Sequence, residues 1–154
     1  MPVRGVIAAT LILVASSAQL NPDFSGERRL NLEASALSPA MSRVQSGKLR
    51  IEHDEPSVRV HLTLVVDDKP FETVVERTTD GREVSSVRQG RQTISTAKWD
   101  GDVLVFTSRS QGPDCEGILS VRYELLDGGR RIKATERIRG CGRDEDNVWV
   151  FDRP

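Results

Sequence analysis

The sequence has few of the residue types on which metal and hydrolytic chemistry usually depend. It contains two histidines, two cysteines and one tyrosine in 154 residues. A zinc site needs three or four convergent ligands, but strand parity places His53 and His61 on opposite faces. The Gly-x-Ser-x-Gly, phosphate-loop and His-Glu-x-x-His motifs are absent. The sequence therefore predicts no metal site and no cofactor, and it favours a non-catalytic protein.

The chain also lacks an apolar run long enough to cross a bilayer. Its longest run covers residues 5–14, whereas a membrane-spanning helix needs about 20 residues. Arg4 precedes this run and Ser16, Ser17 and Ala18 follow it, which is the order found in a secretory signal peptide. A buried N-terminal helix is the alternative. We expect cleavage near Ala18, leaving residues 19–154 as one secreted or periplasmic domain.

An excess of charge of either sign is missing as well. The chain carries 22 basic and 23 acidic residues, and its formal net charge of −1 becomes −2 when Arg4 is removed with the signal peptide. Nucleic acids and anionic membranes attract basic surfaces, so neither is an expected partner. The sequence identifies no protein partner.

The two cysteines, Cys115 and Cys141, both lie in the part of the chain expected to be exported. Export favours a disulfide, and a hairpin that turns at Gly128-Gly129 would bring the two residues together. The glycines on either side of Cys141 would allow a bulge that corrects the register. A pair of free thiols in a metal or redox site is the alternative, but the chain has no Cys-x-x-Cys motif and no histidine nearby.

Short alternating segments separated by turn residues make up most of the remaining sequence. This pattern is typical of β-strands. Strands are expected at residues 25–32, 48–53, 58–66, 70–77, 82–88, 92–99, 102–108, 117–125, 131–139 and 147–152. Residues 33–47 form a long connection with a short helical turn near 40–44, and no other segment has a helical period.

The turns keep the apolar faces of successive segments in step. A two-residue loop at Asp67-Asp68 sets Leu64 opposite Phe71. The turns at Asp80-Gly81, Gln89-Gly90, Asp100-Gly101 and Gly128-Gly129 set Val75 opposite Ser86, Val84 opposite Ser95, Ala97 opposite Leu104, and Val121 opposite Glu136. A slip of one residue would turn an apolar face outward. We therefore predict an all-β antiparallel meander of about eight to ten strands that closes into a barrel.

The same alternation separates an apolar inner face from a charged outer face. The residues expected in the core are Leu62, Leu64, Phe106, Val121 and Ile132. Residues 131–139 present a row of four basic side chains on the opposite face. This row could bind an anionic polymer, or it could be a solvated surface beside acidic neighbours.

Three short segments of the chain are informative: Asp23-Phe24-Ser25-Gly26, Lys98-Trp99-Asp100-Gly101 and Leu126-Asp127-Gly128. They resemble segments of lipocalins and fatty-acid-binding proteins, which are calycin-type barrels. The chain is also similar to small exported bacterial proteins of unknown function that begin with Phe-Ser-Gly-x-Trp. The resemblance covers most of residues 23–152 and implies an up-and-down barrel around a small, mainly apolar ligand.

The chain departs from these families at positions that matter for structure and binding. Their tryptophan two residues after the opening glycine is Arg28 here. The Arg-x-Tyr pair with which fatty-acid-binding proteins hold a carboxylate corresponds to Trp149 and Phe151. A helical lid is not expected either, because residues 33–47 are short and not amphipathic. The resemblance therefore does not imply that this chain captures an anionic lipid with that pair.

Small and polar residues at inward positions point to a cavity. The expected lining consists of Thr73, Ser86, Ser95, Phe106, Tyr123, Glu136 and Trp149. Ligand cavities are mostly apolar with a few polar groups, which fits this set. The alternative is a flattened region in which the opposite walls touch and leave no void.

Glu136 is the most specific functional candidate among these positions, because its inward neighbours are apolar. A buried carboxylate needs a partner or a proton, so Glu136 could hold a ligand or cation. The alternative is a carboxylate near the open end of the barrel that is solvated or bonded to a neighbour. A neutral or cationic amphiphile would then suit the cavity better than a fatty acid. The leading hypothesis is a non-catalytic carrier. The alternatives are an interaction or inhibitor module of the cell envelope with a filled interior, and a cofactor-free enzyme that uses Glu136.

Overall fold

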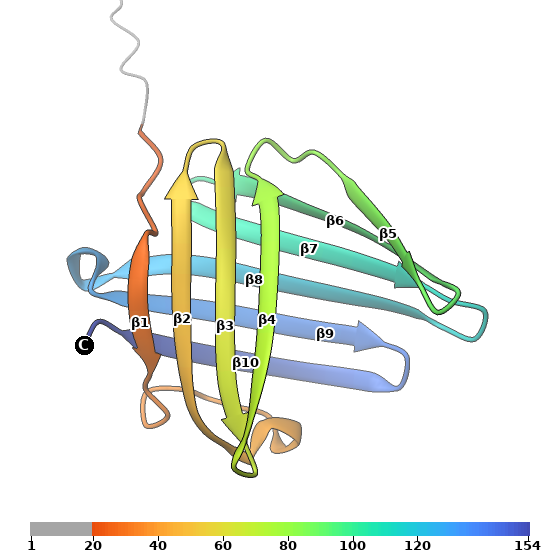
Figure 1. The fold of residues 1–154 in the computed structure, drawn as a ribbon, viewed down its shortest axis with the longest axis horizontal. Helices are drawn as coiled ribbons and strands as arrows, with labels where there is room; N and C mark the ends of the chain where they lie inside the picture. The colour runs from red at the N-terminus through yellow and green to blue at the C-terminus, as the bar shows by residue number, and fades with distance from the viewer. Residues whose placement is uncertain (1–19) are drawn as a thin grey trace, which may run out of the picture.

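The computed structural model describes residues 20–154 as one antiparallel sheet of ten strands that curls into a nearly closed barrel (Figure 1). The strands are β1 (Gly26–Leu30), β2 (Val44–Asp54), β3 (Ser57–Val66), β4 (Lys69–Thr78), β5 (Val84–Arg88), β6 (Arg91–Asp100), β7 (Val103–Gln111), β8 (Glu116–Leu126), β9 (Arg131–Gly140) and β10 (Arg143–Asp152). The expected signal peptide lies outside the described residues. Within them, no helix is long and apolar enough to cross a membrane.

The strand order confirms the predicted meander. Across the sheet it is β4-β3-β2-β1-β10-β9-β8-β7-β6-β5, so nearly every strand pairs with its sequence neighbours. The pairing of β1 with β10 joins the first and last strands. Figure 1 shows β1–β4 crossing in front of β5–β10 as a second layer. Each predicted strand is present, although β2 and β10 begin four residues earlier than predicted.

Most of the predicted registers are also confirmed. Leu64 lies opposite Phe71 across the Asp67-Asp68 turn, in which both aspartates have positive φ (49° and 61°). This is the backbone of a two-residue hairpin turn that follows strand twist. Val84 lies opposite Ser95, and Val121 lies opposite Glu136.

The predicted β4–β5 hairpin is wrong, because β4 and β5 are the two edges of the sheet. Asp80 pairs with Lys98 of β6, and the Gly81 N–H donates to the Ala97 carbonyl at 2.9 Å. The Asp80 carboxylate also accepts from the Arg82 N–H at 3.0 Å. The turn thus fastens the chain to β6 instead of returning it along β4, and Val75 does not face Ser86.

The turn after β6 is displaced from its predicted position. Asp100 pairs with Val103, so the loop consists of Gly101 and Asp102, and Ala97 lies opposite Phe106 instead of Leu104. Gly101 adopts a φ of 61°, which glycine reaches without steric cost. The register differs by two residues, so the same side chains still point inward.

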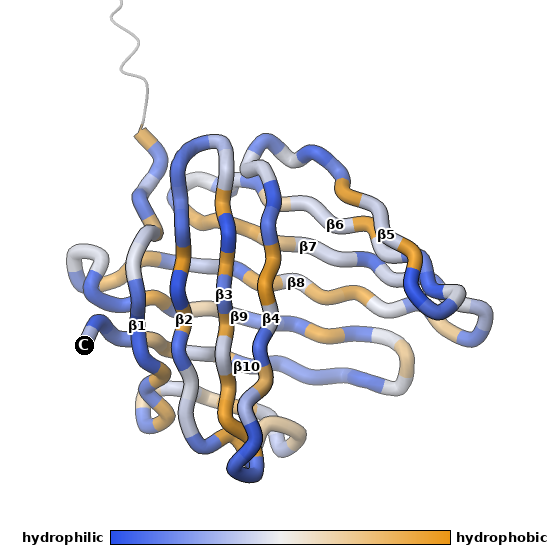
Figure 2. Tube along the Cα trace, in the orientation of Figure 1, coloured by the Kyte–Doolittle hydropathy of each residue, from blue (hydrophilic) through white to orange (hydrophobic). Residues whose placement is uncertain are grey.

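Apolar residues from both layers form the core. Phe24, Leu49, Val58, Leu104 and Ile132 are at most 1% exposed. The other four residues predicted in the core are partly buried against this cluster: Leu62, Leu64, Phe106 and Val121. Figure 2 shows hydrophobic residues concentrated in the strands and mostly hydrophilic turns between β2 and β3 and between β4 and β5.

The segment between β1 and β2 covers one end of the barrel without a helical lid. It contains a single short 3-10 turn, η1 (Pro39–Met41). Its backbone is fastened to β10, where the Ala36 and Val148 backbones pair and the Asn147 side chain accepts from the Ser38 N–H at 2.7 Å. Leu37 and Met41 pack against the core.

A polar cluster fastens the β2–β3 turn to β6. Glu55 accepts hydrogen bonds from Trp99 Nε1 at 2.8 Å, Thr79 Oγ1 at 2.5 Å and His53 Nε2 at 2.9 Å. His53 Nδ1 accepts from the Phe24 N–H at 3.3 Å, which assigns the ring proton to Nε2. The Phe24, His53 and Trp99 rings pack together with centroids 5.7–6.3 Å apart.

Candidate ligand-binding site

The two layers enclose a cavity of about 150 Å³ between strands β3–β4 and β6–β8. Its lining consists of Val60, Val75, Arg77, Ser95, Thr96, Phe106, Thr107, Ser108, Leu119, Val121 and Tyr123. Drug-sized ligands usually occupy about 300–1,000 Å³. This inner cavity alone is therefore large enough for only part of such a molecule.

The inner cavity continues into a wider hollow of about 390 Å³ that is open to solvent, and both are lined by Ser108 and Leu119. This hollow lies on strands β6–β9, near the turns that follow β7 and β9. Figure 1 shows these strand ends extending beyond β4, so the front layer does not cover them. A ligand longer than the inner cavity could extend into this hollow.

Three of the seven predicted site residues line the inner cavity. They are Ser95, Phe106 and Tyr123. The Phe106 and Tyr123 rings meet edge to face with centroids 5.5 Å apart, and Ser95 is only 7% exposed.

Thr73 and Ser86 do not line the cavity. Thr73 is exposed in the middle of β4, and Ser86 is exposed on β5. Their predicted place depended on a β4–β5 hairpin that would have closed the wall. Because β5 pairs only with β6, neither residue has an opposite wall to complete a cavity.

Glu136 and Trp149 form a hydrogen-bonded pair beside the cavity. Glu136 Oε1 accepts from Trp149 Nε1 at 3.2 Å and from Asn147 Nδ2 at 2.9 Å. Trp149 is 6% exposed and lies opposite Ala134 in the core. The Glu136 carboxylate therefore has donors from β10, which corresponds to the bonded-neighbour alternative of the sequence analysis.

Arg77 is the charged cavity residue that the sequence analysis missed. Its Nε and Nη2 donate to Ser95 Oγ at 3.0 and 2.5 Å, and its Nη1 donates to the Glu76 carbonyl at 2.6 Å. Within residues 20–154, no carboxylate forms an ion pair with it. Continuing the inward alternation from Val75 by two residues would have identified it.

Tyr123 provides a second polar group in the cavity. Burial, and to a lesser degree the Glu136 carboxylate, raise the pKa of the Tyr123 hydroxyl well above its usual value. The hydroxyl therefore stays protonated and can donate a hydrogen bond at any physiological pH.

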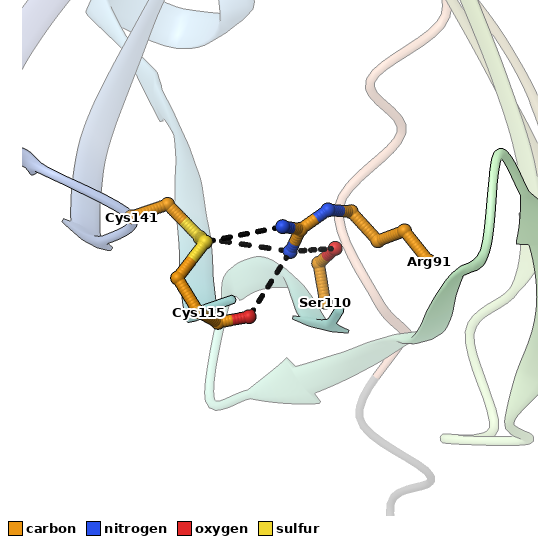
Figure 3. The surroundings of a disulfide bond; sticks show 4 residues. All are labelled: Arg91, Ser110, Cys115 and Cys141. Atoms are coloured by element: carbon orange, nitrogen blue, oxygen red, sulfur yellow. Dashed lines mark hydrogen bonds between the residues drawn. A yellow bond between two sulfur atoms is a disulfide. The ribbon is translucent and has the colours of Figure 1, made fainter. Parts of the chain in front are cut away.

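The predicted Cys115–Cys141 disulfide is present at the rim of the open hollow, with Cα atoms 5.2 Å apart. It links the β7–β8 connection to the β9–β10 turn. Figure 3 shows the Arg91 guanidinium lying against it. Arg91 donates to Ser110 Oγ at 3.2 Å, to the Cys115 carbonyl at 3.4 Å and to Cys115 Sγ at 3.1 Å. The bridge and Arg91 thus connect three turns at this rim.

The outward basic row on β9 is paired with acidic neighbours. Lys133 Nζ lies 2.9 Å from Glu124, and Arg139 Nη2 lies 2.9 Å from Asp146. Arg137 is 3.8 Å from the same aspartate. Such pairing corresponds to a solvated face. In the part of the chain that the structure describes, no group of three or more His, Cys, Asp or Glu residues could hold a metal ion.

Comparison with known proteins identifies the fold only through solved structures. No protein-family model and no curated protein matches the chain. The fluorescent protein UnaG matches with a TM-score of 0.58 at 15% identity, covering 85% of this chain and 97% of that one. A SAHS protein from Ramazzottius varieornatus matches with a TM-score of 0.56 at 12% identity, over 84% and 94%. The REP1-NXSQ fatty acid transporter matches with a TM-score of 0.52 at 17% identity, over 85% and 98%.

These neighbours are calycin-type β-barrels, and the coverage includes almost the whole of each. The chain therefore has the calycin-type barrel fold, as its resemblance to lipocalins and fatty-acid-binding proteins implied. At these identities the likeness concerns the fold alone, so the function has to be argued from the site.

Proposed function

We propose that this calycin-type barrel is a non-catalytic carrier that binds a small, mainly apolar ligand between its two layers. The observation that carries the proposal is the inner cavity, whose walls include Val60, Val75, Phe106 and Val121 and whose end opens into the wider hollow. Apolar walls with a few polar groups are typical of ligand sites. That one structural neighbour is a fatty acid transporter supports the same class of ligand.

The proposal includes export of the protein. The pattern of charge, apolar run and small residues in residues 1–18 supports cleavage near Ala18. The Cys115–Cys141 disulfide supports an oxidising compartment, because such bonds are rare in the cytosol of most organisms. The carrier would then act in the periplasm or outside the cell. N-terminal sequencing of protein recovered from its host tests the cleavage position.

A cavity-filling variant tests the carrier function. Val121 lines the inner cavity, and the bulk of Val121→Trp should remove the space for a ligand. We expect the wild type to bind an environment-sensitive apolar dye and Val121→Trp to lose most of that binding. Ile94→Trp is the matched control, because Ile94 is 36% exposed on the outer face. Dye binding that is absent in the folded wild type, or unchanged in Val121→Trp, would contradict the carrier function.

The unpaired strand edges favour a second candidate, a protein-interaction module. Phe71 and Val74 on β4 are 56% and 51% exposed, and Val87 on β5 is 73% exposed. Unpaired edges can accept an additional strand from a partner. Absence of dye binding together with association to an envelope protein in native mass spectrometry would favour this candidate.

A further inference from the structure

The cavity has one charged group in its lining, and that group is a cation. Of the residues that line it, only Arg77 carries a formal charge, and the others are apolar or bear hydroxyl groups. Arg77 reaches the cavity from β4 and contacts Ser95 of β6, at the seam where the two layers meet without strand pairing.

The Arg77 guanidinium donates hydrogen bonds only to neutral acceptors. A guanidinium has five N–H donors, and Arg77 directs three of them to the Ser95 hydroxyl and the Glu76 carbonyl. The Glu76 carboxylate instead lies 3.9 Å from Arg59. The Arg77 side chain is partly buried, and charges that are withdrawn from water are usually paired, so a bound anion would provide a partner.

The one acid beside the cavity is already partnered. Glu136 accepts from both Asn147 and Trp149, so its carboxylate does not depend on a cationic ligand. The Tyr123 hydroxyl, in contrast, has no hydrogen-bond partner among the described residues and can donate to an acceptor in the cavity. The arrangement of donors therefore favours a ligand with an anionic head.

We infer that Arg77 and Ser95 form the head-group subsite for an anionic amphiphile. This inference rests on the carrier function proposed above. Ser95 is level with Ser108 and Leu119, and Phe106 and Val121 lie two residues further along their strands, away from the hollow. The apolar tail would lie against Phe106 and Val121, and a longer tail would also extend past Leu119 into the open hollow. The subsite lies on β4 and β6, away from the β10 positions Trp149 and Phe151, which are buried in the core. The inference replaces the neutral or cationic ligand that Glu136 suggested in the sequence.

Three probes with the same chain and different heads test this inference. Dodecanoate, 1-dodecanol and dodecylammonium are titrated at pH 7.5, below their aggregation concentrations, by displacement of the apolar dye. A hydrogen-bonded charge pair is worth about 1.5–3 kcal/mol, or roughly tenfold or more in affinity. We expect dodecanoate to bind at least about tenfold more tightly than 1-dodecanol, and dodecylammonium to bind most weakly.

Variants assign this preference to Arg77. In Arg77→Gln the affinity for dodecanoate should fall to that for 1-dodecanol, while binding of 1-dodecanol changes little. Arg77→Lys should keep part of the preference, because it retains the charge but not the planar fork of donors. Arg137→Gln is the matched control, because Arg137 lies on the outer face beside Asp146.

The outcomes separate this inference from the carrier function. If none of the three probes binds the folded wild type, the carrier function itself fails. If all three bind wild type equally, or if dodecylammonium binds best, the anionic subsite is wrong while the carrier function stands. A preference for dodecanoate that persists in Arg77→Gln would place the head elsewhere. The wild-type comparison is decisive even if Arg77→Gln does not fold.

Discussion

Arg28 is a fully buried arginine beside the β8–β9 turn, at the position where the barrels that this chain resembles carry a tryptophan. Its side chain is 0% exposed, with Nη1 3.2 Å from the Phe24 carbonyl and Nη2 2.7 Å from the Gly129 carbonyl. Its Nε has no hydrogen-bond partner. Burial, followed by repulsion from Arg153, lowers the pKa of Arg28. The Arg28 side chain fills its position in the interior, but burying its charge costs folding free energy.

Two substitutions separate the volume of Arg28 from its charge. Arg28→Ala should lower the free energy of unfolding by about 2–5 kcal/mol, because it leaves a cavity. Arg28→Met should cost less than about 1 kcal/mol or be stabilising, because apolar residues of similar volume often replace buried charges without loss. Urea denaturation of both variants measures this difference. Equal losses in the two would show that the carbonyl hydrogen bonds outweigh packing at this position.

The Glu55 carboxylate makes the free energy of unfolding depend on pH. Burial acts to raise the pKa of Glu55, but the hydrogen bonds from Thr79, His53 and Trp99 together outweigh it, and the pKa lies below the ordinary value of 4.5. A carboxylate whose pKa is lower in the folded state stabilises the fold above its unfolded pKa. That contribution is lost as the pH falls through the folded pKa.

We therefore expect the free energy of unfolding to decrease as the pH falls below about 4.5, and to decrease less steeply in Glu55→Gln. Glu33→Gln is the control, since Glu33 is exposed and has no hydrogen bond among the described residues. Urea titrations at a series of acidic pH values give the comparison. An identical slope in wild type and Glu55→Gln would show that the cluster does not contribute to acid sensitivity.

At the scale of elements, the three turns at the rim of the open hollow depend on one cross-link. The Cys115–Cys141 bridge joins two of them, and Arg91 brings the β5–β6 hairpin against it. The β5 strand is exposed along its length and pairs only with β6. The position of this hairpin therefore depends on Arg91 and on the bridge that holds its acceptors.

Removing the bridge should loosen all three turns together. In Cys115→Ser/Cys141→Ser we expect a loss of about 3 kcal/mol in unfolding free energy from the 26-residue loop. Amide hydrogen exchange in the β5–β6 turn should also become faster, although that turn contains no cysteine. Arg91→Ala should accelerate exchange in that turn alone. Unchanged exchange there in the double variant would show that the hairpin is held independently of the disulfide.

The elements also show how far the sequence determines the fold. Alternation identified all ten strands, because side-chain burial on one face forces a period of two. Turn chemistry set the register at Asp67-Asp68 and Gln89-Gly90. It failed at Asp80, because a local turn signal cannot tell whether the next strand returns beside the last one or pairs elsewhere. Asp80 pairs with Lys98, which is a tertiary contact.

The site was less predictable than the strands for the same reason. Ser95, Phe106 and Tyr123 line the cavity. They could be predicted because strand alternation, which is a local property of the sequence, shows that their side chains point inward. Thr73 and Ser86 follow the same alternation, but they lie on edge strands without an opposite wall. The partners of Glu136 come from β10, and the absence of an acidic partner for Arg77 depends on the whole arrangement. Neither could be read from local spacing.

At the scale of the whole molecule, the barrel is closed by β1 and β10 and open where β4 and β5 fail to pair. The closed side carries the apolar core with Phe24, Leu49 and Ile132. The open side carries the cavity, the only charged group in its lining and the adjoining hollow. This asymmetry would give the proposed ligand a route to the interior that does not require a lid to move.

Nuclear Overhauser effects from a bound probe show whether an apolar chain occupies the space between the two layers. Dodecanoate labelled with ¹³C along its chain is added to the wild-type barrel, and contacts to aromatic and methyl protons of the protein are recorded. We expect contacts from the labelled chain to the rings of Phe106 and Tyr123, which line the cavity. Contacts confined to the outer-face residues Val87 and Ile94, or no contacts at all with a folded protein, would rule out binding between the layers.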